Sequence, residues 1–77
     1  MNILLFRHLV VSSKEKGMEL KTLYLTRQHF NDFALDLKKE YWREMDTIPQ
    51  EFYLGDILVK PSEYCNAVHE DYILEYA

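Results

Sequence analysis

The stretch from Thr26 to Met45, TRQHFNDFALDLKKEYWREM, constrains the fold most, because it is the longest segment of the chain with a clear period. Its apolar residues recur at the three- and four-residue spacing of a helix that buries one face. They are Phe30, Phe33, Ala34, Leu37, Tyr41 and Met45. Thr26 is suited to cap the first turn, and Pro49 disfavours helix at the residue before it. The pattern predicts one amphipathic helix that organises the rest of the chain.

The polar side of this helix carries acidic residues at four-residue spacing, with basic residues between them. The acids are Asp32, Asp36, Glu40 and Glu44, and the bases are Lys39 and Arg43. Such a face is commonly a solvated surface with weak ion pairs. The alternative is an acidic contact ridge for a basic protein partner.

Leu35 and Trp42 lie outside the main apolar stripe, seven residues apart and on about the same side of the helix. Either a second part of the same chain packs on them, or they are exposed for a partner. An exposed Trp would be a strong contact residue, because Trp is enriched at interface hot spots. The candidate protein-binding residues are therefore Asp32, Leu35, Asp36, Glu40 and Trp42.

Length and charge limit the class of protein. Seventy-seven residues form one small domain, and a single cysteine allows no intrachain disulfide, which fits a reducing, cytoplasmic setting. The net charge is −4, although residues 1–17 are net basic. An acidic chain is a poor direct nucleic-acid binder, because phosphate contact needs Lys and Arg. It suits a basic protein partner or a second copy of itself, and no cofactor is expected.

The first segment, Met1–Val11, is apolar and predicts a β-strand; it is too short to span a bilayer. Residues 12–17 then predict a polar turn. The run Lys-Glu-Lys-Gly before Met18 is compatible with a purine-rich ribosome-binding site in the gene. We hypothesise that Met18 is an alternative start in a bacterial or phage gene. Residues 1–17 would then be an extension, and residues 18–77 the single domain.

The remaining segments predict a small sheet. Leu20–Leu25 is typical of a strand, and Glu51–Lys60 is typical of a hairpin that turns at Gly55-Asp56, the alternative being one strand with a bulge at Gly55. Residues 62–69 favour a short helix, and Tyr72, Leu74 and Tyr76 alternate as in a strand.

The predicted class is α+β: one amphipathic helix packed on a small antiparallel sheet, βαββ-like, with a short C-terminal helix or strand. One helix covers only one face of such a sheet. The other face would carry Tyr24 and further aromatic residues, and would favour a homodimer or a partner.

The residues that could carry chemistry are few. Cys65 and His69 are four apart, as zinc ligands or a thiolate–imidazole pair on one helix face would be. The chain holds no paired C-x-x-C spacing, and its glycines, Gly17 and Gly55, form no phosphate-binding loop. No catalytic site is predicted.

The leading hypothesis is a non-catalytic protein-interaction module, a small acidic accessory or inhibitor protein encoded by a phage or mobile element. One alternative is a small dimeric transcription regulator in which the dimer clusters Arg27, Lys38, Lys39 and Arg43. Another is a metal-binding module in which two further ligands join Cys65 and His69.

Overall fold

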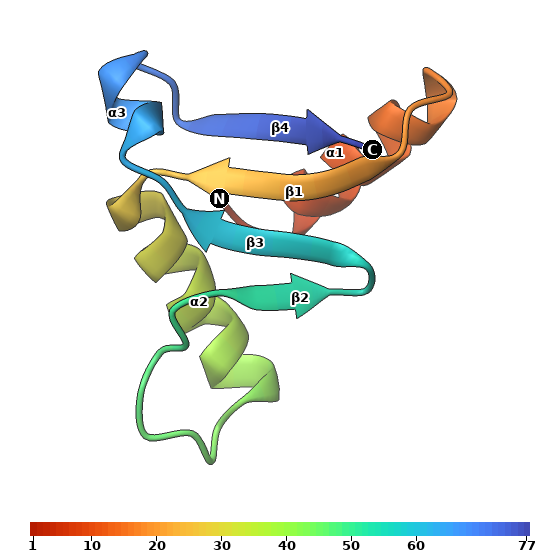
Figure 1. Cartoon of the computed structure of the whole chain (residues 1–77). Helices are drawn as coiled ribbons and strands as arrows, with labels where there is room; N and C mark the ends of the chain where they lie inside the picture. Colours follow the sequence, from red (N-terminus) through yellow and green to blue (C-terminus); the bar gives the residue numbers. More distant parts are fainter.

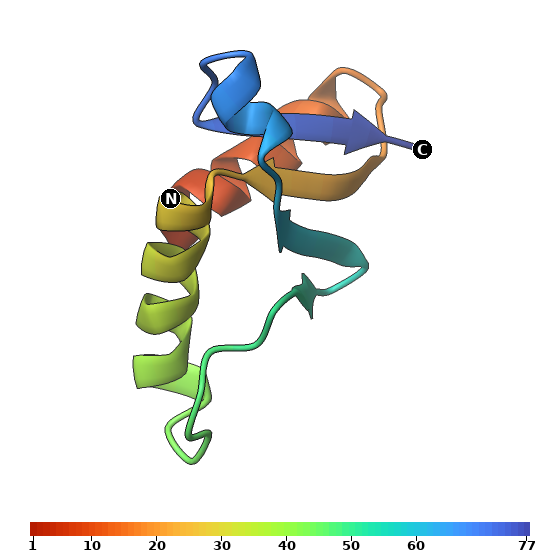
Figure 2. The same cartoon turned by 60° about the vertical axis from the view of Figure 1, so that its left-hand side comes forward.

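The computed structural model describes residues 1–77. The fold has two layers, one of helices and one of strands. Its elements are α1 (Ile3–Glu15), β1 (Leu20–Leu25), α2 (Arg27–Tyr41), β2 (Phe52–Leu54), β3 (Ile57–Pro61), α3 (Tyr64–Ala67) and β4 (Tyr72–Tyr76). The four strands form one sheet, and both long helices, α1 and α2, lie on the same face of it (Figures 1 and 2). The predicted α+β class, with a helix packed on a small sheet, is confirmed.

The sheet is mixed, whereas the sequence predicted an antiparallel one. The strand order is β2-β3-β1-β4; β1 pairs with β3 in parallel and with β4 in antiparallel fashion, and β2 and β3 form an antiparallel hairpin. The parallel pair arises because β2 runs back toward the level of the start of β1, and β3, the second strand of the hairpin, then takes the place beside β1. Leu23 is thereby opposite Val59, in the middle of the sheet.

Helix α2 confirms the central prediction over most of its length. The Thr26 hydroxyl caps its start by accepting a hydrogen bond from the His29 N–H at 3.2 Å. Its core face is Phe30, Phe33, Ala34 and Leu37, all buried. The prediction was wrong at the C-terminal end: the helix ends at Tyr41, which is 62% exposed, and Met45 is 40% exposed.

The N-terminal segment is a helix, so the strand predicted for Met1–Val11 was wrong. The Asn2 side chain caps α1 by accepting a hydrogen bond from the Leu5 N–H at 2.8 Å. Phe6, Leu9 and Ser13 are buried, at three- and four-residue spacing. The Ser13 hydroxyl donates to the Leu9 carbonyl at 2.8 Å, which satisfies this buried polar group inside the helix. The polar residues expected to form a turn continue this helix to Glu15.

The C-terminal half follows the predicted order. The hairpin turns at Gly55, whose φ of 62° suits glycine. The short helix is α3, only Tyr64–Ala67, and it lies beyond one end of the sheet, near the start of α2 (Figure 1). Strand β4 then pairs along β1 as the last element. None of the helices has the length and apolar character needed to cross a membrane.

Replacing Phe6 by Ala should lower the free energy of unfolding by about 3 kcal/mol, because it removes a buried ring from the core. Phe6 is 6% exposed, and its ring centroid lies 6.0 Å from that of Phe33. Urea denaturation measures the change. Leu4→Ala is the matched control, since Leu4 is 71% exposed on the same helix and should change stability by less than about 0.5 kcal/mol.

A chain that starts at Met18 should be much less stable than the full chain for the same reason, since it lacks all of α1. The same denaturation experiment tests this. An unchanged midpoint would show that residues 1–17 are a dispensable extension, as the alternative-start hypothesis requires.

Candidate functional site

The outer side of α2 carries the acidic ridge, which we define as Asp32, Asp36 and Glu40. All three are exposed, one turn apart on a helix whose opposite side is buried. This anchoring fixes the spacing of the carboxylates, because Phe30, Phe33 and Leu37 hold the helix against the sheet. A ridge on a rigid helix needs little ordering when it binds a partner.

The carboxylates of the acidic ridge are not neutralised within the chain. The only ion pairs of the chain with a nitrogen–oxygen distance within 4.0 Å are Lys60 with Glu51, at 3.9 Å, and His29 with Asp71, at 4.0 Å. Neither pair involves the acidic ridge. Arg43, one of the basic residues between the acids in the sequence, donates from Nε to the Lys39 carbonyl at 2.8 Å and so caps the end of the helix. The carboxylates of the acidic ridge therefore face solvent with no ion-pair partner within 4.0 Å.

The two apolar candidates, Leu35 and Trp42, are separated by the structure. Leu35 is 42% exposed on α2, so it is an apolar side chain available to a partner. Trp42 follows the last helical residue, with φ −124° and ψ 42°, and leaves the helical path. Its ring packs edge-on against Phe52, with centroids 5.0 Å apart. Trp42 is therefore half-buried by the chain's own hairpin, the first of the two alternatives, and supports the fold.

Cys65 and His69 do not form a reactive pair. The Cys65 side chain is fully buried, and no hydrogen bond joins it to His69. Burial raises the pKa of the Cys65 thiol; a backbone hydrogen bond acts against this and the Glu70 carboxylate adds to it. His69 lies after α3, at φ 58°, and is exposed. No three His, Cys, Asp or Glu side chains come together as a metal site would require.

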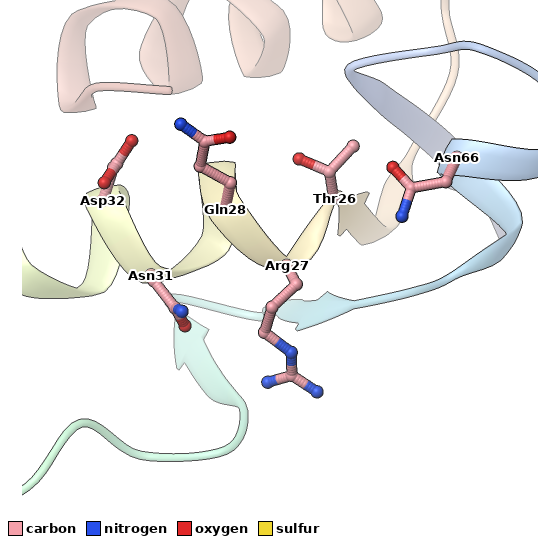
Figure 3. A pocket seen from close by; sticks show the side chains of 6 residues that line it. All are labelled: Thr26, Arg27, Gln28, Asn31, Asp32 and Asn66. Atoms are coloured by element: carbon pink, nitrogen blue, oxygen red, sulfur yellow. The ribbon is translucent and has the colours of Figure 1, made fainter.

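A polar depression of about 490 Å³ lies beside the start of α2. Its lining is Thr26, Arg27, Gln28, Asn31, Asp32 and Asn66, the last from α3. Figure 3 shows that these side chains do not converge: Arg27 and Asn31 point to one side of the helix, whereas Gln28 and Asp32 point to the other. The hydroxyl of Thr26 is already used as the helix cap. The depression therefore offers no focused set of groups to a ligand.

An apolar groove that sequence reasoning missed lies between α1 and the β2–β3 turn. It encloses about 720 Å³, and more than half of its lining residues are apolar, among them Val10, Val11 and Met18. The basic residues Arg7 and Lys14 of α1 line the groove, and so do the acidic residues Glu19 and Asp56. The groove was hidden because it exists only if residues 1–15 are helical.

The uncovered face of the sheet carries Tyr24, Tyr53, Leu58 and Ile73, as the predicted exposed aromatic face requires. Tyr53 is 66% exposed, while the others are half-buried by one another. The Tyr24 hydroxyl donates to the Glu75 carboxylate at 3.4 Å. Burial raises the Tyr24 pKa, and the charge of Glu75 raises it further.

The basic residues of the regulator alternative are spread along α2. Arg27 is its first residue, whereas Lys38 and Lys39 lie in its last turn, about 17 Å away at a rise of about 1.5 Å per residue. Asp32 and Asp36 of the acidic ridge lie between these two positions along the helix. These residues therefore form no continuous basic face within one copy of the chain.

Trp42→Ala should lower the free energy of unfolding by about 2 kcal/mol, because it removes a half-buried ring from contact with Phe52. Tyr41→Ala, at the exposed neighbouring position, should have an effect of less than about 0.5 kcal/mol. Urea denaturation followed by circular dichroism measures both. Equal effects of the two substitutions would contradict the internal role of Trp42.

Stability should fall as the pH rises above the ordinary thiol value of 9.0. Between that value and the raised pKa of Cys65 in the folded chain, the thiol ionises only in the unfolded chain, so ionisation favours unfolding. Cys65→Ala should remove this part of the pH dependence. Tyr24→Phe should remove a second part of the pH dependence. This part begins near the ordinary tyrosine pKa of 10.0, because the pKa of Tyr24 is also raised in the folded chain. Urea midpoints measured from neutral to alkaline pH test both, and a Cys65→Ala profile identical to wild type would contradict the first.

Comparisons with known proteins add no family assignment. No family model, no curated protein and no solved structure gives a significant match to the chain. Among the surfaces of the chain, the acidic ridge with Leu35 combines fixed negative charge and an exposed apolar side chain on a helix that is anchored by its buried face.

Proposed function

We propose that the chain is a non-catalytic protein-interaction module that binds a basic protein partner through the acidic ridge and Leu35. The observation that carries this proposal is that Asp32, Asp36 and Glu40 lie exposed and without ion pairs on a helix whose other side is buried. Charged surfaces of this kind steer a partner of opposite charge and set its orientation. An accessory or inhibitor protein acts by occupying such a partner.

Leu35 supplies the apolar part of the proposed contact. It lies within one turn of both Asp32 and Asp36, and 42% of its surface is exposed. An apolar anchor beside charged residues matches the common arrangement of interfaces, in which a desolvated centre is enclosed by a polar rim. Trp42 is no longer part of this surface, because its ring packs on Phe52.

Charge reversal on the acidic ridge should weaken binding, while a matched reversal elsewhere should not. The variants are Asp36→Lys, in the middle of the acidic ridge, and Glu15→Lys, at the exposed end of α1; both change the net charge equally. A partner captured from host lysate by the wild type is identified, purified and titrated against each variant. Asp36→Lys should weaken binding by about tenfold or more, while Glu15→Lys should not.

The salt dependence of the same titration is a second readout. Binding of the purified partner should weaken as ionic strength rises, since exposed charges are screened within about 10 Å at 0.1 M salt. Leu35→Ala should weaken binding without changing that salt dependence. A partner that binds both charge variants alike would place the contact on another surface.

A further inference from the structure

Strand β4 forms an open edge of the sheet. It pairs with β1 on one side and has no strand on the other. The opposite edge, β2, is only three residues long, whereas β4 has five residues and contains neither Pro nor Lys. Long edges without such blocking residues are free to pair with another strand. The β1–β4 pair contains one bulge, whose extra residue, Lys21, belongs to β1. Strand β4 itself is therefore regular.

The backbone hydrogen bonds show which groups of β4 face outward. The Asp71 carbonyl accepts from the Thr26 N–H at 3.4 Å, and the Ala77 N–H donates to the Glu19 carbonyl at 2.9 Å, so both residues direct their backbone toward the neighbouring segment. Because direction alternates along a strand, Tyr72, Leu74 and Tyr76 direct their N–H and C=O groups to the open side.

The sequence of β4 is complementary to itself in one antiparallel register. When Leu74 is opposite Leu74 of a second copy, Tyr72 is opposite Tyr76, and the three outward residues of each strand exchange about six main-chain hydrogen bonds. Ile73 is then opposite Glu75 on the uncovered face, so no like charges meet. A symmetric shift to centre on Ile73 places Asp71 opposite Glu75, and a shift to Glu75 places that carboxylate opposite itself. Each shift also leaves only about four of the bonds.

Apolar surface accompanies this edge on the helix side of the sheet. Tyr72, Leu74 and Tyr76 pack on the core but are all partly exposed. Leu5 of α1 is 39% exposed and lines a small hollow with Tyr72. A strand added beside β4 would cover these side chains, so main-chain pairing and apolar burial favour the same contact.

We propose that β4 pairs with β4 of a second copy of the chain, antiparallel and centred on Leu74, which joins two four-stranded sheets into one continuous sheet. The partner at this edge is therefore the chain itself. The surface is separate from the acidic ridge, so the inference does not depend on the proposed function.

A charge exchange across the two-fold axis tests both the contact and its register. Ile73→Glu places a carboxylate opposite Glu75 twice in the dimer, and should raise the dimer dissociation constant by about tenfold or more. Ile73→Glu combined with Glu75→Lys places opposite charges across the axis and should restore dimerisation to within about threefold of wild type. Sedimentation equilibrium measures the constants, and circular dichroism confirms that each variant is folded.

Backbone methylation gives a test that leaves every side chain in place. Cys65 is the only cysteine, so a synthetic peptide of residues 65–77 can be ligated to residues 1–64. An N-methyl group at Leu74 blocks the open edge, and should yield a folded monomer. The matched group at Ile73 faces β1, and should instead destabilise the fold.

Three outcomes would overturn the proposal. The first is a wild-type chain that stays monomeric up to about 0.5 mM, where even a weak self-association of millimolar order is detectable. The second is a dimer insensitive to both Ile73→Glu and N-methylation at Leu74, which would place the contact elsewhere. The third is a dimer that Ile73→Glu disrupts but Glu75→Lys does not restore, which would reject the Leu74 register.

Discussion

The ring contacts around Phe52 hold the layers of this small fold together. Its ring centroid lies 5.5 Å from that of Phe30, 5.9 Å from that of Phe33 and 5.0 Å from that of Trp42. Phe6 extends the cluster to α1 through Phe33. A three-residue edge strand has few hydrogen bonds of its own, so β2 depends on this side chain for its place in the sheet. Tilted and edge-on rings at these distances add specific contacts to the burial of apolar area.

The parts of the fold that were predictable from the sequence are those set by local pattern. The apolar stripe of α2 identifies its core face because each step of three or four residues returns to the same side. The strand Leu20–Leu25 was predicted with its observed bounds, and Gly55 marked the hairpin turn because it accepts a positive φ. On the candidate site, the same periodicity placed Asp32 and Asp36 on the exposed side of α2, where the structure has them.

The parts that were not predictable depend on contacts between distant residues. A short apolar run such as Met1–Val11 fits a strand or a buried helix equally well. In the folded chain it is helical, and Phe6 packs against Phe33, a residue distant in the sequence. The parallel pairing of β1 with β3 depends on which strand of the hairpin lies inward, and no local pattern encodes that choice. Trp42 has the spacing of an exposed helical residue, yet the helix ends just before it and Phe52 receives its ring.

The two proposed contact surfaces are compatible in one assembly. Helix α2 packs on β1 and β3, whereas β4 is the outer strand beyond β1 (Figure 1). Pairing through β4 therefore leaves Asp32, Asp36 and Glu40 of both copies free. A dimer of this kind carries two acidic ridges, and a partner with two basic sites would bind the second ridge at a high effective concentration.

Such pairing would also add buried surface to a chain whose size permits only a modest hydrophobic core. Small domains often gain stability from oligomerisation in this way. In the proposed assembly the open edge would add buried surface, whereas the acidic ridge would keep its charge available to another protein.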